Sequence, residues 1–278
     1  MARVPFGVSR LDSMIGGGAP TGSTVLLGSE VGAGGREFLY TTAAMNGLAH
    51  ADEEQFELYY GDLEGSARLP DSVQYLSFTD GRNAIVEEME YTMDEGLVEA
   101  ATEAIEFEDL SEEYFQLSQV PSDWYAGKTP DINALGDRHD RRDVLDAIGE
   151  YLSREGEGSL VVIDSVTDLI SVASGEMDWT DITLLIKGLT KAAKKWGGMV
   201  VLLVTLDTLE ATELGRLMEA TDGTLLFEWE TGGSERARTM VVKQFRGVLS
   251  RLEEEEIIRF ETEIHDGGFD ISDVRKIR

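Results

Sequence analysis

The sequence predicts an α/β fold in which a mostly parallel sheet is flanked by helices and is followed by a C-terminal β extension. Short apolar runs alternate with longer segments whose apolar residues recur every three or four positions, which is typical of alternating strands and helices. The runs LVVI and MVVLLV are apolar without interruption, as expected for strands covered on both faces. At 278 residues and without a low-complexity linker, we expect one domain over 1–278.

The expected strands are short runs rich in β-branched and aromatic residues, at 23–27, 56–60, 73–79, 159–163, 199–204 and 223–229. Two segments, 141–152 and 181–196, place their apolar residues on one helical face and predict helices packed on the sheet. After Gly232 and Gly233 the pattern changes to closely spaced strands. The chain is therefore expected to end in β structure.

Residues 80–140 form the least regular part, and we expect a variable acidic insertion of helix and loop there. Apolar side chains recur at every fourth position from Ile85 to Ile105, which predicts an amphipathic helix. Its methionine-bearing stripe is either a core face or a groove for a partner. The stretch 120–140 contains two prolines and two glycines and is expected to be a loop.

Charge and composition exclude several functional classes. The 54 acidic residues outnumber the 24 basic ones, so the formal net charge is -30. This acidity resembles proteins of salt-accumulating haloarchaea, where molar salt reduces the Debye length to roughly 3 Å and screens the repulsion. A local acidic surface for a basic partner is the alternative. Either origin argues against DNA or RNA as a main ligand.

Cysteine is absent and the three histidines lie far apart, so disulfides, thiolate metal sites and histidine metal sites are not expected. The sequence has no run of eighteen apolar residues and no signal-peptide pattern. We expect a cytoplasmic protein without a membrane partner.

The stretch GSEVGAGGREF at 28–38 is a glycine-rich turn between a predicted strand and a predicted helix. Phosphate loops of the form G-x-x-x-x-G-K-[ST] hold phosphates with backbone N–H groups, a lysine and a magnesium-binding hydroxyl. Without gaps the motif covers Ser29 to Arg36, with Gly35 at the lysine position and Arg36 at the hydroxyl position. A slip of one residue moves these positions to Arg36 and Glu37. The candidate phosphate-binding residues are Gly32, Ala33, Gly34, Gly35, Arg36 and Glu37.

The segment before this turn resembles the entry segment of KaiC-like proteins of the RecA superfamily, a group that includes RadA-like ATPases. The matching residues are Gly7, Leu11, Asp12, Gly16, Gly17, Gly18, Pro20 and Gly22. The resemblance implies a RecA-like three-layer P-loop NTPase fold, of a haloarchaeal type with a degenerate Walker A motif.

Later motifs follow in the order of that family. FELYYGDLEG resembles the second strand and its acidic tip, SLVVIDSVTDL resembles the Walker B strand, and MVVLLVTLD resembles a strand with Thr205 at its polar end. The resemblance implies that Asp164 holds Mg²⁺ through water, and that Glu64 positions the attacking water. The alternatives are that Asp164 caps a helix and that Glu64 is a solvated carboxylate.

RARTMVVKQFRG resembles the late strand whose lysine and arginine reach a neighbouring subunit's nucleotide, here Lys243 and Arg246. Residues three apart face opposite sides of a regular strand, so both can point at one phosphate only if a bulge intervenes. A charged pair on an edge strand is the alternative.

The family resemblance implies ATP and Mg²⁺ as cofactors. Because the loop has lost the lysine and the hydroxyl, the leading hypothesis is a nucleotide-binding or pseudo-ATPase protein with a regulatory or interaction role. The alternatives are an active KaiC-like ATPase with a remodelled loop and a DNA recombination or repair accessory protein. The expected partner is a second copy, in a RecA-like ring or filament, or a regulatory protein.

Overall fold

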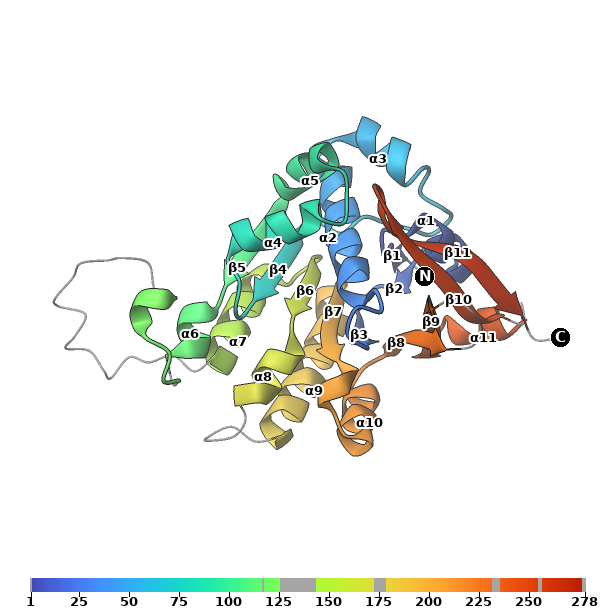
Figure 1. Cartoon of the computed structure of the whole chain (residues 1–278). Coiled ribbons are helices and arrows are strands. Elements are labelled where there is room, and N and C mark those ends of the chain that lie inside the picture. The colour runs from blue at the N-terminus through green and yellow to red at the C-terminus, as the bar shows by residue number, and fades with distance from the viewer. Residues whose placement is uncertain are drawn as a thin grey trace.

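The computed structural model of the chain describes residues 2–116, 118–125, 144–172, 179–231, 236–254 and 257–276. A nine-stranded sheet with the order β11-β10-β9-β8-β3-β7-β6-β4-β5 runs through the molecule (Figure 1). No helix of these described residues is long and apolar enough to cross a membrane.

Six strands of the sheet run parallel to one another: β3 (Ser23–Ser29), β4 (Val73–Ser77), β5 (Ile105–Asp109), β6 (Leu160–Asp164), β7 (Met199–Thr205) and β8 (Gly223–Thr231). Three antiparallel strands extend it beyond β8: β9 (Arg236–Phe245), β10 (Ile257–His265) and β11 (Gly268–Lys276). A separate two-stranded sheet pairs β1 (Arg3–Val4) with β2 (Ala19–Pro20). The predicted mostly parallel sheet and its C-terminal β extension are confirmed.

The sheet separates two layers of helices. They are α1 (Ser9–Ile15), α2 (Gly35–Ala51), α3 (Glu53–Tyr59), α4 (Arg82–Glu90), α5 (Glu95–Thr102), α6 (Ser111–Phe115), α7 (Val144–Glu155), α8 (Val166–Val172), α9 (Trp179–Trp196), α10 (Ala211–Ala220) and α11 (Leu249–Glu254). Strand side chains alternate between the layers: Val25 and Leu27 pack with the cluster of α2 and α5, and Leu26 packs with the cluster of α7, α9 and α10.

The strand predicted at 56–60 is wrong, because residues 56–59 belong to the helix α3 and Tyr60 is its C-cap. Phe56 and Tyr60 are four residues apart, both are buried, and their rings stack with centroids 4.8 Å apart. Leu58 between them is 76% exposed. Asp52 caps the helix by accepting a hydrogen bond from the Gln55 N–H at 3.0 Å. The second large strand of the chain is therefore β4, at 73–77.

The single helix predicted between Ile85 and Ile105 is two helices, α4 and α5, followed by the edge strand β5. The break falls at Asp94, whose carboxylate accepts from the N–H groups of Gly96 and Leu97 and caps α5. The whole predicted stripe is buried, so it is a core face: Ile85, Met89, Met93, Leu97, Ala101 and Ile105. Most of the loop predicted at 120–140 lies outside the described residues.

The entry segment is built around the buried Asp12. Its carboxylate accepts hydrogen bonds from the N–H groups of Phe6 and Gly7 at 2.9 and 3.0 Å, and from the Tyr60 hydroxyl at 3.2 Å. Gly7 has φ 79°, and an added Cβ would lie 2.7 Å from Met45 Cβ. This motif therefore anchors the chain that leads into β3.

Candidate functional site

The glycine-rich loop lies at the carboxyl end of the central strand β3, where β3 passes into α2. Ser29 is level with Thr205 of β7 and Phe227 of β8. Gly34 precedes the first helical residue with φ 107°, a conformation that favours glycine. A cavity of about 290 Å³ opens here and is lined by Ser29, Glu30, Val31, Gly32, Gly34, Arg36, Glu37, Leu203 and Thr205.

Ser29 occupies the space that a side chain at Gly35 would need. A Cβ added to Gly35 would lie 2.5 Å from Ser29 Cβ and 2.7 Å from Ser29 Oγ. The Gly35 N–H also donates to Ser29 Oγ at 3.3 Å. In the gapless register these are the first and the lysine positions of the phosphate-loop motif. The chain thus departs from the motif at two positions that touch each other. Because Ser29 replaces the first glycine, the lysine position has no room for a side chain.

Arg36 extends from the first turn of α2 to the strand β6. Its Nη2 lies 3.1 Å from Asp164 Oδ1, and its Nη1 lies 3.6 Å from Glu88 Oε2 on α4. The Asp164 side chain is 6% exposed, and the Arg36 side chain is 44% exposed. One half-exposed guanidinium thus compensates one buried and one half-exposed carboxylate.

Two tyrosines complete this polar cluster. The Tyr75 hydroxyl donates to Asp164 Oδ2 at 2.7 Å, and the Tyr40 hydroxyl donates to Glu88. Burial raises the pKa of Asp164, and the charge of Arg36 opposes that rise, as does the hydrogen bond from Tyr75. Burial also raises the pKa of Tyr40, as does the charge of Asp164. Both hydroxyls therefore remain donors at neutral pH.

The residues at Asp164 do not fit a magnesium ion. Mg²⁺ binds through hard oxygen ligands, and a guanidinium stands at the position that supplies the hydroxyl in the motif. Asp164 Oδ1 has no hydrogen-bond partner among the described residues, and its close neighbour is the cationic Arg36. Among those residues no group of three or more histidine, cysteine or acidic side chains is arranged to hold a metal ion.

The C-terminal sheet holds the apex of the loop. Trp229 donates from its indole Nε1 to the Val31 carbonyl at 3.0 Å, and Arg238 donates from Nε to the Gly32 carbonyl at 3.0 Å. The Arg238 guanidinium lies over the Trp229 ring, 5.0 Å from its centroid. Glu30 accepts from the Trp229 backbone N–H at 2.9 Å. The loop is thus attached to β8 and β9 by both backbone and side chains.

Part of the loop backbone remains available to an anion. The Val31 N–H donates to Asp207 and the Ala33 N–H donates to the Glu30 carbonyl. The N–H groups of Gly34, Arg36 and Glu37 have no hydrogen-bond partner within the parts of the chain that the structure describes. These are the unpaired donors of a helix N-terminus. The cavity walls also carry the carboxylates of Glu30 and Glu37, which disfavour a polyanion.

The structure brings together most of the predicted phosphate-site residues. Gly32, Gly34, Arg36, Glu37 and Thr205 line the same cavity. The buried Ala33 and Gly35 belong to the same turn and helix start, and Asp164 joins the site through Arg36.

Glu64 lies elsewhere. Its carboxylate accepts from the Ser13 hydroxyl at 2.8 Å, against α1, and it follows the helix α3 instead of a strand. The acid at the tip of the second strand is Asp80, which comes three residues after β4. Ser77, the last residue of β4, is level with Asp164. The run VQYLSFTD carried this signal in the sequence.

Lys243 and Arg246 lie at the opposite end of β8 from the loop. Gly223, where β8 begins, is level with Val25, four residues and about 13 Å before Ser29. A shift in the β8–β9 register leaves Lys243 as an extra residue, so the bulge that both side chains require is present. Arg246 pairs with Asp222 at 3.2 Å. Their contact with a neighbouring subunit stays a prediction.

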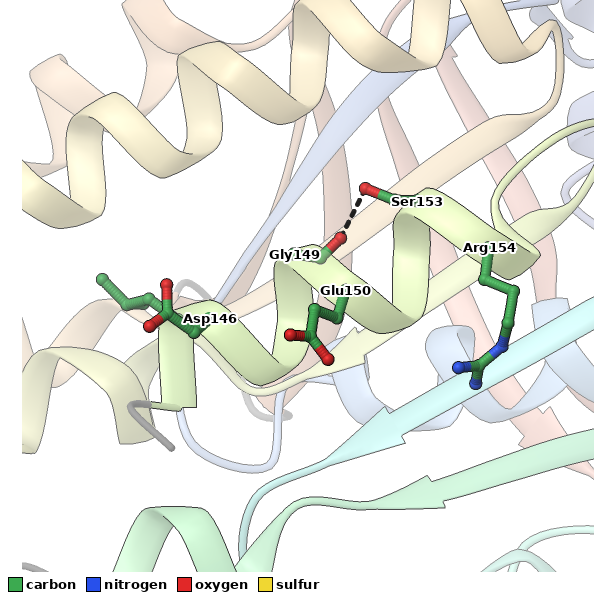
Figure 2. A pocket seen from close by; sticks show the side chains of 6 residues that line it. Asp146, Gly149, Glu150, Ser153 and Arg154 are labelled. Carbon is green, nitrogen blue, oxygen red and sulfur yellow. Dashed lines mark hydrogen bonds between the residues drawn. The ribbon is translucent and has the colours of Figure 1, made fainter. Parts of the chain in front are cut away.

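A second hollow lies on the outer face of α7 (Figure 2). Its lining comes from this one helix: Leu145, Asp146, Gly149, Glu150, Ser153 and Arg154. The Ser153 hydroxyl donates to the Gly149 carbonyl at 2.6 Å, and the labelled charged residues Asp146, Glu150 and Arg154 follow one another along the helix (Figure 2). The hollow is therefore lined by one helix, whereas the loop site is lined by residues of several elements.

Sequence reasoning missed the partners that approach the loop from distant segments. They are Tyr75, Glu88, Asp207, Trp229 and Arg238. A regular period marks a core face but does not pair polar side chains that lie far apart in the sequence. Trp229 near the end of β8 and Arg238 near the start of β9 were the available signal for the attachment of the loop to these strands.

A solved KaiC-like protein from the hyperthermophilic archaeon Pyrococcus horikoshii has a similar structure, with a TM-score of 0.63. The two chains are 16% identical, and the match covers 98% of this chain and 99% of that one. Neither a protein-family model nor a curated protein matches the sequence. The likeness shows that the chain has a KaiC-like fold of the RecA type.

Proposed function

We propose that this chain is a pseudo-ATPase of the RecA and KaiC superfamily, with a regulatory or interaction role and without efficient hydrolysis. The observation that carries the proposal is the ion pair between Arg36 and Asp164. In an active phosphate loop the corresponding positions jointly hold Mg²⁺. Here they neutralise each other, and Ser29 fills the space of the phosphate-binding lysine.

Hydrolysis of a nucleoside triphosphate needs cations that stabilise the charge of the transition state. Loss of one such electrostatic group typically costs roughly 3 to 4 kcal/mol of transition-state stabilisation. This site lacks the lysine and the magnesium hydroxyl, and Arg36 is already paired with Asp164 and Glu88. These losses support impaired hydrolysis.

Binding of ATP without turnover is the part of the proposal that the open N–H groups support. The N–H groups of Gly34, Arg36 and Glu37, unpaired among the described residues, lie at the N-terminus of α2, where the helix dipole favours an anion. The carboxylates of Glu30 and Glu37 oppose it. We therefore propose weak ATP binding.

The test is a titration of ATP into the purified full chain in molar KCl, the solvent that its strongly acidic composition suggests. Heat of binding and release of inorganic phosphate are followed together, with and without Mg²⁺. Saturable heat without phosphate release is the expected result. If no heat of binding is observed, the chain does not bind ATP, and only the interaction role of the proposal remains.

Steady phosphate release that Asp164→Asn abolishes contradicts the proposal and establishes the alternative, an active KaiC-like ATPase with a remodelled loop. Asp52→Asn is a control, because it changes a carboxylate that caps α3 and contacts neither the loop nor Arg36. Assembly into a ring or filament, with Lys243 and Arg246 at a neighbour's site, belongs to the same proposal. Sedimentation of the protein with and without ATP tests it.

A further inference from the structure

We infer that Arg36 is the resident cation of this site and excludes divalent metal ions from it, so that a phosphate-bearing ligand binds there without metal. This inference deepens the proposed function, on which the statement about the ligand rests. The exclusion of metal stands on the geometry of Arg36, Asp164 and Glu88 alone.

The first argument is position. Arg36 takes the place of the hydroxyl residue in the gapless register, and α2 begins one residue earlier, at Gly35. The close approach of Ser29 to Gly35 agrees with that register, because it brings together the first position and the lysine position of the motif. The Arg36 guanidinium then spans from α2 to the carboxyl end of β6, two strands away from β3 in the sheet. It therefore occupies the route between the loop and Asp164.

The second argument is charge. Asp164 is buried, and a buried carboxylate requires a compensating cation. Arg36 supplies it at 3.1 Å. A divalent cation at the same carboxylate would lie beside the guanidinium, and two like charges at such a distance repel strongly away from bulk water. Because the pKa of a guanidinium lies far above neutral pH, Arg36 cannot lose its charge to admit the metal.

The third argument is the second carboxylate. Glu88 reaches the same guanidinium at 3.6 Å and is held by the Tyr40 hydroxyl. Removal of the guanidinium would leave two carboxylates facing one space. Such an arrangement attracts a hard divalent cation. The inference therefore predicts that a neutral residue at Arg36 creates metal sensitivity that the natural chain does not have.

The experiment is thermal unfolding of the full chain in molar KCl, with millimolar MgCl₂ or MnCl₂ added. The natural chain, Arg36→Gln, Arg36→Lys and the double variant Arg36→Gln/Asp164→Asn are compared. Metal is expected to raise the Tm of Arg36→Gln by about 3 °C or more, relative to its effect on the natural chain. Arg36→Lys and the double variant are expected to respond like the natural chain, whose response measures general binding to its acidic surface.

Equal responses of the natural chain and Arg36→Gln overturn the inference. A second measurement needs only the natural chain: paramagnetic broadening of amide NMR signals by Mn²⁺. Absence of selective broadening at Gly34 to Glu37 is expected, and saturable selective broadening there overturns the exclusion of metal. Neither measurement uses nucleotide, so failure of ATP binding leaves this result standing.

The ligand part is tested by the heat of ATP binding in EDTA and in Mg²⁺. Equal affinity in the two solutions is expected. Affinity that requires Mg²⁺ overturns the metal-free mode of binding, whereas absence of heat in both solutions contradicts the ATP-binding part of the proposed function.

Discussion

Tyr75 and Asp164 face each other across the neighbouring strands β4 and β6, and the Tyr75 hydroxyl donates to Asp164 Oδ2 at 2.7 Å. Both residues are buried. Tyr40 makes the corresponding hydrogen bond to Glu88, which is half-exposed. The two tyrosines therefore form a matched pair that differs in the burial of the acceptor.

Tyr75→Phe is expected to lower the free energy of unfolding by about 2 kcal/mol, because it leaves a buried carboxylate oxygen without a donor. Tyr40→Phe is expected to cost less than about 1 kcal/mol, because water replaces the lost donor at Glu88. Urea unfolding in molar KCl measures both. Equal costs would show that Asp164 does not depend on Tyr75.

Restoration of the phosphate-loop residues is expected to require three changes. Gly35→Lys/Arg36→Thr alone should destabilise the chain by roughly 1 to 3 kcal/mol from steric strain, because the new Cβ meets Ser29. Ser29→Gly in addition should relieve that strain and increase ATP affinity in the presence of Mg²⁺. Calorimetry and unfolding of the double and triple variants test this. A double variant as stable as the triple one argues against the gapless register.

Arg238→Ala is expected to loosen the apex of the loop without unfolding the sheet. Loss of its hydrogen bond to the Gly32 carbonyl, and of its stacking on Trp229, should cost about 1 kcal/mol locally. Amide hydrogen exchange at Val31 and Ala33, whose N–H groups are hydrogen-bonded in the loop, should become about five-fold faster. Arg259→Ala is the control, because Arg259 pairs with Glu228 and Glu230 of β8. Similar acceleration in both variants would contradict a specific clamp.

Asp12 is expected to make stability depend on pH. Burial raises its pKa from 3.8 to about 7, against the hydrogen bonds from Phe6, Tyr60 and Gly7. The folded state therefore binds more protons than the unfolded state between about pH 4 and pH 7, and stability falls as pH rises through that window. Above pH 7 this contribution is constant.

Asp12→Asn should remove that slope, which is at most about 1.4 kcal/mol per pH unit. Asp52→Asn is the control, since Asp52 caps α3 and its pKa is lowered by the hydrogen bonds from Gln55. It should keep the natural slope. Unfolding curves from pH 4 to pH 8 decide between the two results. An unchanged slope in Asp12→Asn would assign the pH dependence to other carboxylates.

The sequence by itself predicted the elements whose signal is local. Apolar and β-branched runs predicted β3, β4, β6, β7 and β8, because a strand covered on both faces has few polar positions. The edge strand β5 was missed, because Ile105 was assigned to the helical stripe, and the strand predicted at 56–60 was wrong. The prediction of a strand from FELYY was wrong because so short a run, with three aromatic residues and one leucine, fits a strand and an i, i+4 helical face equally well. Only burial of Phe56 and Tyr60 together, with Leu58 exposed, separates the two.

The candidate site divides in the same way. The loop with Arg36 was predictable because it follows a recognisable strand, and Asp164 and Thr205 were predictable because each is the last residue of one. The carboxyl ends of parallel strands meet at one edge of a sheet. The partners that decide the chemistry of the site could not be predicted from the sequence. Arg36 meets Glu88 through α4, and Gly32 meets Arg238 from 206 residues away. Only the tertiary structure decides such pairs, because a polar side chain's partner depends on sheet order and helix packing and leaves no period in the sequence.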